Sequence, residues 1–279
     1  MGGRLPRLCP RAARSLCCQS SSRWDDGRRE GDARLSEIAN SRAVIVSGGT
    51  SGLGLATAQL LAARGARVWI LGSREQTVAA ALDKLNIVGG SACDAADESS
   101  VEAAVTHAVE ALGGLDGVFV NAGVDGEDKN AMELSLDNFR RILDVNVLGA
   151  FALARASARV MERGSAIVIN ASVSGLRPEH GFVDYNVSKA AAITLAQSLA
   201  LDLADRGIAV SAICPGYIRT PMTEPMLDDP ERAAELLSLI PAGRFGEPVD
   251  VAELVDFLLS GRATYMTGSV LSIDGGRSV

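Results

Sequence analysis

The sequence predicts a single α/β domain built on a doubly wound, seven-stranded parallel sheet, and three observations predict it. From residue 41 onward, short β-branched segments alternate with longer helical ones. The short segments are apolar throughout, which is typical of strands buried on both faces of a sheet. A glycine-rich stretch joins the first of them to the first helical segment. With 279 residues and 47% hydrophobic content, the chain is long enough to bury one large core.

Seven segments have the composition and length of buried strands. In chain order they are residues 43–47, 67–71, 86–92, 117–121, 166–171, 208–213 and 269–273, of which 86–92 has the weakest pattern. Helical patterns cover residues 54–64, 99–112, 136–161, 184–206 and 249–259. Because helices separate the strands, the connections are crossovers, which place helices on both faces of a parallel sheet.

The first forty residues have a different composition from the rest of the chain. They are rich in arginine and have no sustained apolar period, so we expect residues 1–40 to be disordered and residues 41–279 to form the domain. Up to Trp24 the segment contains serines and no acidic residue, as organellar transit peptides do. The alternative, which we favour, is an extension without function on a cytoplasmic protein. Deletion of residues 1–36 is then expected to leave fold and activity intact.

Composition excludes several classes of partner. The formal net charge of -7 and the lack of a basic stripe argue against nucleic acid. No apolar run approaches the ~20 residues that cross a bilayer. The five cysteines form no Cys-x-x-Cys pair and have no histidine at a ligand spacing, so we expect neither disulfides nor a metal site.

The glycine-rich stretch, residues 47–54, predicts a phosphate-binding turn. A helix that begins directly after a buried strand directs free N–H groups and the positive end of its dipole to one point. Gly48 permits the sharp turn, Gly52 allows a pyrophosphate to approach the backbone, and Gly54 allows the helix to pack on the strand. Because this turn follows the first strand of an alternating chain, we interpret it as a nucleotide site.

Several further motifs follow in a fixed order. They are Asp94 in "CDAAD", "VNAG" at 120–123, Asn146 in "DVNVLG", Ser172 in "NASVSG", Tyr185 and Lys189 in "YNVSK", and "PGYIRT" at 215–220. Together with the G-x-x-x-G-x-G spacing, they make residues 41–279 similar to the short-chain dehydrogenase/reductase family, in the branch that contains 3-oxoacyl-carrier-protein reductases. Val120 departs from the family's NNAG motif at its first position.

The resemblance implies a Rossmann fold, a catalytic set and a cofactor site. The implied catalytic residues are Asn146, Ser172, Tyr185 and Lys189. The implied cofactor-binding residues are Gly48, Ser51, Gly52, Leu53, Gly54, Ser73, Arg74, Asp94, Asn121, Ala122, Gly123, Tyr185, Lys189, Pro215, Gly216, Ile218 and Thr220. The resemblance further implies that Lys189 holds the nicotinamide ribose and that Asn146 supports a water-mediated proton relay. It also implies that the chain forms a tetramer through helices 136–161 and 184–206 and through the C-terminal region.

The side chains themselves predict acid–base chemistry. Tyr185 and Lys189 lie four residues apart on one helix face, so the ammonium reaches the phenol. This ammonium and the positive nicotinamide of the oxidised cofactor are expected to lower the pKa of the phenol. Tyr185 is then the proton-transfer group, and Ser172 orients the substrate oxygen. A Tyr-x-x-x-Lys pair or a serine after a strand is common by itself. The occurrence of Tyr185 thirteen residues after Ser172, beside the other motifs, favours catalysis.

The function we predict is an NAD(P)-dependent oxidoreductase that interconverts a carbonyl and a secondary alcohol. A nucleotide sensor without activity and an epimerase or dehydratase of the same family are the alternatives. Residues 220–248 interrupt the alternation and are expected to cover the substrate, either with an apolar wall or with leucines and methionines that only pack the cover itself. A small-molecule substrate of 3-oxoacyl, polyketide, steroid or sugar type fits this pattern.

The choice of dinucleotide depends on the end of the second strand. Enzymes that use NAD usually place a carboxylate there to bind the ribose 2′-hydroxyl. Here Gly72 supplies none, whereas Ser73 and Arg74 offer a hydroxyl and a guanidinium for a 2′-phosphate. We therefore expect NADP(H), with NAD(H) as the alternative if Arg74 is only a solvated residue of the next helix.

Overall fold

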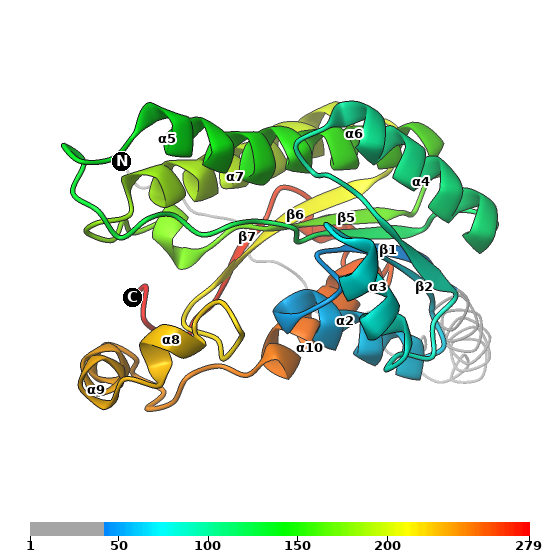
Figure 1. The fold of residues 1–279 in the computed structure, drawn as a ribbon. Coiled ribbons are helices and arrows are strands. Elements are labelled where there is room, and N and C mark those ends of the chain that lie inside the picture. Colours follow the sequence, from blue (N-terminus) through cyan, green and yellow to red (C-terminus); the bar gives the residue numbers. More distant parts are fainter. Residues whose placement is uncertain (1–41) are drawn as a thin grey trace, which may run out of the picture. The chain divides into compact units, whose positions relative to one another are not determined.

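The computed structural model describes residues 42–279. The expected disordered leader and the domain boundary at residue 41 lie outside the described residues. The described part of the chain is one α/β domain in which strands and helices alternate, as expected (Figure 1).

The seven strands form one parallel sheet in the order β3-β2-β1-β4-β5-β6-β7. Their bounds are β1 (Ala43–Ser47), β2 (Arg67–Gly72), β3 (Gly89–Ala92), β4 (Gly117–Val120), β5 (Ala166–Asn170), β6 (Ala209–Pro215) and β7 (Val270–Ile273). All seven expected strands are present, and the weakest candidate is reduced to its last four residues. The predicted doubly wound fold is confirmed.

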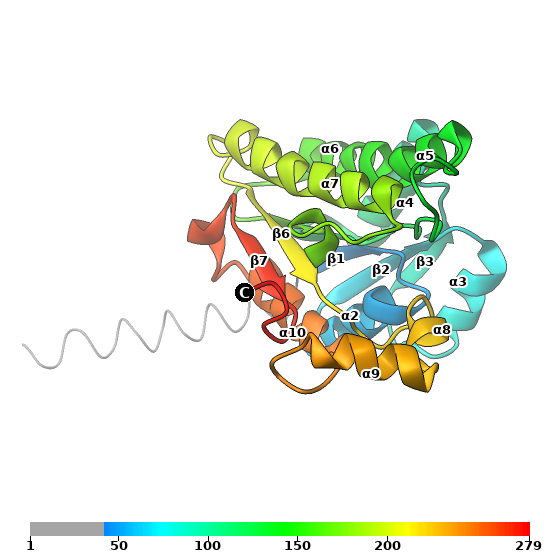
Figure 2. The same cartoon turned by 90° about the vertical axis from the view of Figure 1, so that its left-hand side faces the viewer.

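Two layers of helices cover the sheet (Figures 1 and 2). The helices are α2 (Gly52–Ala63), α3 (Glu75–Leu82), α4 (Glu98–Leu112), α5 (Leu136–Leu143), α6 (Ala150–Val160), α7 (Val183–Asp202), α8 (Glu224–Leu227), α9 (Pro230–Ser238) and α10 (Pro248–Leu259). Alternate residues of β1 point to opposite layers. Val44 and Val46 pack with α2 and α10, whereas Ile45 packs with α4, α6 and α7. Both faces of the sheet are therefore buried, which explains the continuous apolar runs.

The sheet order places a crevice between β1 and β4. The chain leaves β1 towards β2 on one side and continues from β4 towards β5 on the other, so the crossovers diverge at this point. In doubly wound sheets, ligands bind at the carboxyl ends of the strands where the order reverses. The glycine turn after β1 and the "NAG" segment after β4 both lie at this edge.

The long helix expected over residues 136–161 is divided in three. Between α5 and α6 the chain makes a π-helical turn, Asp144–Gly149, which contains Asn146. Gly149 is packed so closely on the Ala95 carbonyl oxygen that a Cβ there would lie 2.2 Å from it. A π-turn inserts one residue per turn and reorients the side chains within it, and such turns are frequent at functional sites.

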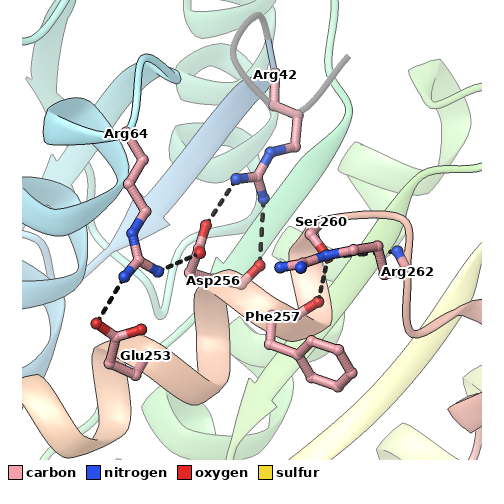
Figure 3. Close-up of polar contacts among 7 residues, drawn as sticks. All are labelled: Arg42, Arg64, Glu253, Asp256, Phe257, Ser260 and Arg262. Atoms are coloured by element: carbon pink, nitrogen blue, oxygen red, sulfur yellow. Dashed lines mark hydrogen bonds and ion pairs between the residues drawn. The ribbon is translucent and has the colours of Figure 1, made fainter. Parts of the chain in front are cut away.

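A buried ionic cluster fixes the first strand to the last long helix (Figure 3). Arg42, directly before β1, donates to the Asp256 carboxylate at 2.6 Å and to the Asp256 carbonyl at 3.3 Å. Arg64, after α2, donates to the other Asp256 oxygen at 2.5 Å and to Glu253 at 2.7 Å. Asp256 is thus shared by two guanidinium groups and joins β1, α2 and α10.

Candidate active site

The glycine turn has the conformation that the sequence predicted. Gly48 and Gly52 have φ values of 62° and 50°, which favour glycine. A Cβ on Gly54 would lie 2.2 Å from the Gly48 carbonyl oxygen, so only glycine lets α2 start this close to β1. The first turn of α2 contains no acidic side chain. Its N–H groups and dipole therefore face the crevice without an opposing charge, which suits a pyrophosphate.

Side-chain hydrogen bonds join the carboxyl ends of three strands. The Ser47 hydroxyl accepts from the backbone N–H groups of Asn121 and Ala122 at 2.8 and 3.0 Å. The Asn121 amide donates to the Ser47 carbonyl at 2.9 Å and accepts from the Asn170 amide at 2.9 Å. The ends of β1, β4 and β5 are therefore held in fixed register beside the glycine turn.

A cavity of about 410 Å³ opens at this edge of the sheet. Most of the predicted site residues line it, namely Gly48, Ser51, Gly52, Leu53, Ser73, Asp94, Asn121, Ala122, Gly123, Ser172, Tyr185, Lys189, Pro215, Gly216, Ile218 and Thr220. Gly54, Arg74 and Asn146 are not among its lining residues. The structure thus brings together segments that are as far apart in the sequence as Gly48 and Thr220.

The three predicted residues outside the lining have separate places. Gly54 packs α2 against the turn, as expected. Arg74 is exposed and precedes α3 as its N-cap, next to the lining residue Ser73. Asn146 is buried, and its amide pairs with the Val124 backbone, accepting from N–H at 2.8 Å and donating to C=O at 2.9 Å. Asn146 therefore holds the segment that follows β4.

The remaining three catalytic candidates meet in the cavity. Ser172 follows β5 and is buried, while Tyr185 and Lys189 lie one turn apart on α7. The Lys189 Nζ lies 5.5 Å from the centroid of the Tyr185 ring and donates to the Asn170 carbonyl at 2.9 Å. Gly123 lies close to both this ammonium and Asn146. A Cβ on Gly123 would lie 3.6 Å from Nζ and 3.2 Å from the Asn146 side-chain oxygen.

The electrostatics of this group differ from the expectation. Burial raises the pKa of Tyr185, the Asp125 carboxylate raises it further, and a hydrogen bond from Ser172 opposes the rise. Burial likewise lowers the pKa of Lys189 to about 8. In the chain by itself the tyrosine pKa is therefore not lowered, because loss of hydration and the Asp125 carboxylate outweigh the hydrogen bond from Ser172.

Sequence reasoning missed several residues of this site. Thr50 and Asn170 line the cavity, and the Asp125 carboxylate influences the Tyr185 phenol. Thr50 and Asn170 lie at the carboxyl ends of β1 and β5, so the rule that ligands bind at strand ends was a usable signal. No short-range pattern marks Asp125, because its relation to Tyr185 depends on how the segment after β4 folds over α7.

The segment that follows β6 forms a small core of its own. Leu227, Leu236, Ile240 and Phe245 are buried together, with Met226 and Leu237 packed against them. Met222 lines the cavity, and Leu239 is exposed. Most of the apolar residues expected for a substrate wall therefore pack the cover itself, which is the second of the two expected arrangements.

Two absences apply to the residues that the structure describes. Over residues 42–279, no helix is both long enough and apolar enough to cross a membrane. Within the same range, His, Cys, Asp and Glu side chains form no cluster suited to a metal ion.

Comparison with known proteins gives consistent matches. The model of the family described as Enoyl-(Acyl carrier protein) reductase matches residues 48–278. A 2,5-dichloro-2,5-cyclohexadiene-1,4-diol dehydrogenase from Sphingobium indicum is 39% identical over 247 residues, covering 85% of this chain and 97% of that protein. A cyclohexanol dehydrogenase from an Acinetobacter species is 34% identical over 247 residues, covering 86% and 96%.

Solved structures match over the same range. The crystal structure of levodione reductase has a TM-score of 0.81 and 35% identity, covering 85% of this chain and 97% of that one. A short chain dehydrogenase from Burkholderia cenocepacia in complex with NADP has a TM-score of 0.78 and 34% identity, covering 85% and 98%.

The fold, the cavity and these matches define the class of protein. It is an NAD(P)-dependent oxidoreductase that acts on an alcohol or a carbonyl group. The chain belongs to the short-chain dehydrogenase/reductase family, as the resemblance of its motifs implied.

Proposed function

We propose that the chain interconverts a ketone and a secondary alcohol, with Tyr185 as the proton-transfer residue. The observation that carries this proposal is the meeting of Ser172, Tyr185 and Lys189 at one end of a cavity whose other wall is the glycine turn. The dinucleotide fits because glycines leave the turn open and the α2 N-terminus has no acidic residue. When bound, it supplies or accepts the hydride.

The chain's own residues perform the proton transfer. In the direction of reduction, the Tyr185 hydroxyl donates its proton to the substrate oxygen, and Ser172 donates a hydrogen bond that orients the same oxygen. In the direction of oxidation, Tyr185 takes the alcohol proton. The charge of Lys189 stabilises the tyrosinate that exists during turnover, because an opposite charge within a few ångströms favours the ionised form. Asn146 holds the backbone that faces Lys189.

We propose NADP(H) as the preferred cofactor. Ser73 lines the cavity directly after β2, and Arg74 follows it with an exposed side chain. No carboxylate lies at Gly72, the position where enzymes specific for NAD usually hold the ribose. The Burkholderia cenocepacia relative was solved in complex with NADP, which agrees with this choice but concerns that protein.

The substrate we propose is an uncharged secondary alcohol or ketone on a small ring. Two carboxylates, Asp125 and Glu179, act electrostatically on Tyr185 and disfavour an anionic group near the reacting oxygen. Met222 adds apolar surface to the cavity. The names of two relatives, a cyclohexanol dehydrogenase and a dichlorocyclohexadiene-diol dehydrogenase, support ring alcohols as the first compounds to try.

A direct experiment separates this function from its alternatives. Purified protein is mixed with NADPH or NADH and a panel of ketones, and with the oxidised cofactors and the matching alcohols. Steady change in the near-ultraviolet absorbance of the reduced nicotinamide supports an oxidoreductase. A changed substrate with constant absorbance indicates an epimerase or dehydratase, and cofactor binding without any turnover indicates a sensor.

We also propose that the chain assembles into a homotetramer. Helices α5, α6 and α7 lie side by side on one layer (Figures 1 and 2). Large apolar side chains on this layer are exposed, including Leu148, Phe151, Val187 and Leu201, of which Leu201 is 80% exposed. Burial of these exposed apolar side chains against a second copy of the chain is what supports the proposal.

A further inference from the structure

A chain of polar contacts leads from Ser172 through Ser174 and Glu179 to Arg277, near the end of the chain. The Ser174 backbone N–H donates to the Ser172 hydroxyl oxygen at 3.1 Å, and the Ser172 hydroxyl donates to the Ser174 hydroxyl at 3.2 Å. The Ser174 hydroxyl in turn donates to the Glu179 carboxylate at 3.3 Å. Both serines are buried. The position of the Ser172 oxygen therefore depends on Ser174, and the hydroxyl of Ser174 depends on Glu179.

Two residues from other segments also bind the Glu179 carboxylate. The Tyr217 hydroxyl, after β6, donates to the second carboxylate oxygen at 3.1 Å. Arg277, after β7, forms an ion pair with Glu179 at 3.1 Å and donates to the Tyr217 hydroxyl at 3.3 Å. Its guanidinium lies 4.8 Å from the centroid of the Tyr217 ring. Arg277 thus holds Glu179 through charge and Tyr217 through both its hydroxyl and its ring.

The ion pair between Arg277 and Glu179 is largely buried. The side chains of Arg277 and Glu179 are only 12% and 22% exposed. An ion pair with so little solvent is weakly screened, and removal of the guanidinium leaves the carboxylate without its opposite charge. Surface ion pairs, by comparison, contribute little.

The backbone of Glu179 is held independently of Arg277. The Asn186 side chain accepts from the Glu179 N–H at 3.2 Å and donates to the Glu179 carbonyl at 2.7 Å. Asn186 is the residue after Tyr185 on α7. Loss of Arg277 is therefore expected to release the Glu179 carboxylate while the loop itself stays attached to α7.

We infer that Arg277 is a positioning residue for the reaction: it fixes the Glu179 carboxylate, which fixes Ser174, whose backbone N–H holds the Ser172 oxygen. When substrate binds, the single proton of the Ser172 hydroxyl turns from the Ser174 hydroxyl to the substrate oxygen, and the Ser174 N–H keeps the Ser172 oxygen in place. This inference rests on the proposed function of Ser172. Tyr217 also packs against the buried cluster of the segment that covers the cavity, Leu227, Leu236, Ile240 and Phe245. The same contacts therefore join the last segment of the chain, the cover and the catalytic serine.

The test compares Arg277→Met with two matched variants. Arg277→Met is expected to lower kcat about two- to tenfold, the range of one hydrogen bond, with little change in the dissociation constant for the cofactor. Arg277→Lys keeps the charge and is expected to recover part of the loss. Arg177→Met is the control. Arg177 lies in the loop that contains Glu179 and binds the last segment of the chain, but only through the backbone carbonyls of Arg277 and Val279. It is expected to keep the wild-type kcat.

A double-mutant cycle decides whether the effect passes through Ser174. In a Ser174→Ala background, Arg277→Met is expected to cause no further loss of kcat. A double variant whose loss of kcat equals the product of the two single losses would overturn the inference. A loss of kcat in Arg177→Met equal to that in Arg277→Met would overturn it too. A wild-type protein without turnover on any ketone or alcohol would overturn the proposed function as well, whereas an active wild type with multiplied losses would overturn the positioning role alone.

Discussion

The Lys189 ammonium lies 5.5 Å from the centre of the Tyr185 ring, and its hydrogen bond goes to the Asn170 carbonyl rather than to the phenol. Any effect of Lys189 on Tyr185 therefore has to pass through its charge, because its hydrogen bond goes elsewhere. Because both groups are buried and each loses hydration, the pKa of the phenol rises and the pKa of the ammonium falls to about 8. The phenol therefore stays protonated. A neutral Tyr185 is suited to donate a proton to a carbonyl oxygen.

Tyr185→Phe is expected to fold and bind cofactor but to lose most turnover. It removes only the hydroxyl that we propose transfers the proton, and a positioned acid or base typically contributes ~100- to 10,000-fold. Steady-state kcat measures the loss, and Ser172→Ala is expected to show a similar but smaller one. Tyr265→Phe removes the same hydroxyl from a fully exposed ring and serves as the control. Near wild-type turnover in Tyr185→Phe, where proton transfer limits the rate, would refute the role.

Lys189→Met is expected to make the cofactor-free protein more stable at pH 7. The folded protein holds this lysine at a pKa of about 8, whereas an unfolded lysine titrates near 10.4. Between these two pKa values the unfolded state binds more protons, so the stability of the wild type rises with pH across this window. Below pH 8 the whole destabilisation caused by the buried ammonium remains. We expect a gain of roughly 1–3 kcal/mol at pH 7 that shrinks from about pH 8 to pH 10.

Urea unfolding of both proteins at several pH values measures this difference. Lys84→Met is the control, because Lys84 is exposed and its substitution to the same residue should leave the stability at pH 7 nearly unchanged. A Lys189→Met protein less stable than wild type at pH 7 would contradict the prediction.

Arg74→Ala is expected to weaken the preference for NADPH over NADH by roughly ten- to a hundredfold, the value of one charge-assisted hydrogen bond. The ratio of kcat/KM for the two cofactors measures it. Lys84→Ala removes the same charge beyond the other end of α3 and should leave the ratio unchanged. A wild-type enzyme that prefers NADH, or a preference that ignores Arg74→Ala, would refute the assignment.

Asp256→Asn is expected to destabilise the fold by about 3 kcal/mol at pH 7, because Arg42 and Arg64 lose their shared carboxylate. Burial alone would raise the pKa of Asp256, but hydrogen bonds from both arginines hold it below its usual range. The stabilisation is therefore present above the unfolded pKa, about 3.9, and is lost as the pH falls through the folded pKa. Unfolding curves at pH 7 and pH 3 should show the difference between the two proteins shrinking in acid.

The control for this cluster is Glu253→Gln. Glu253 binds Arg64 from a half-exposed position, so its loss is expected to change stability by about 0.5 kcal/mol or less. Equal losses of stability in Asp256→Asn and Glu253→Gln would show that burial does not decide how much each carboxylate contributes to stability.

The proposed tetramer is expected to dissociate when charge enters the α5–α7 layer. Leu148→Glu with Phe151→Glu places two carboxylates on the exposed apolar face and should yield smaller species in sedimentation velocity. Val88→Glu, at an exposed apolar residue before β3, is the matched control. A wild-type protein that sediments as a monomer at micromolar concentration would exclude the tetramer.

Much of the fold and part of the site could be predicted because their signals are local. Continuous apolar strands, the glycine turn and the spacing of Tyr185 and Lys189 each lie within a few residues of sequence. The π-turn at Asn146 was missed, because helical periodicity over residues 136–161 does not reveal one inserted residue. The pKa of Tyr185 was expected to fall beside Lys189 and the oxidised nicotinamide, whereas in the chain by itself it rises, because the sequence names the neighbouring lysine but not the depth of burial.

The sequence by itself determined the parallel sheet, the turn at the end of β1 and the order of the motifs, since periodicity and backbone freedom are properties of short segments. Only the tertiary structure decided which distant side chains meet. Arg42 pairs with Asp256 across 214 positions, and Arg277 reaches Tyr217 across 60. Such pairs follow from the order in which crossovers arrange the strands, and their strength follows from the water that packing excludes.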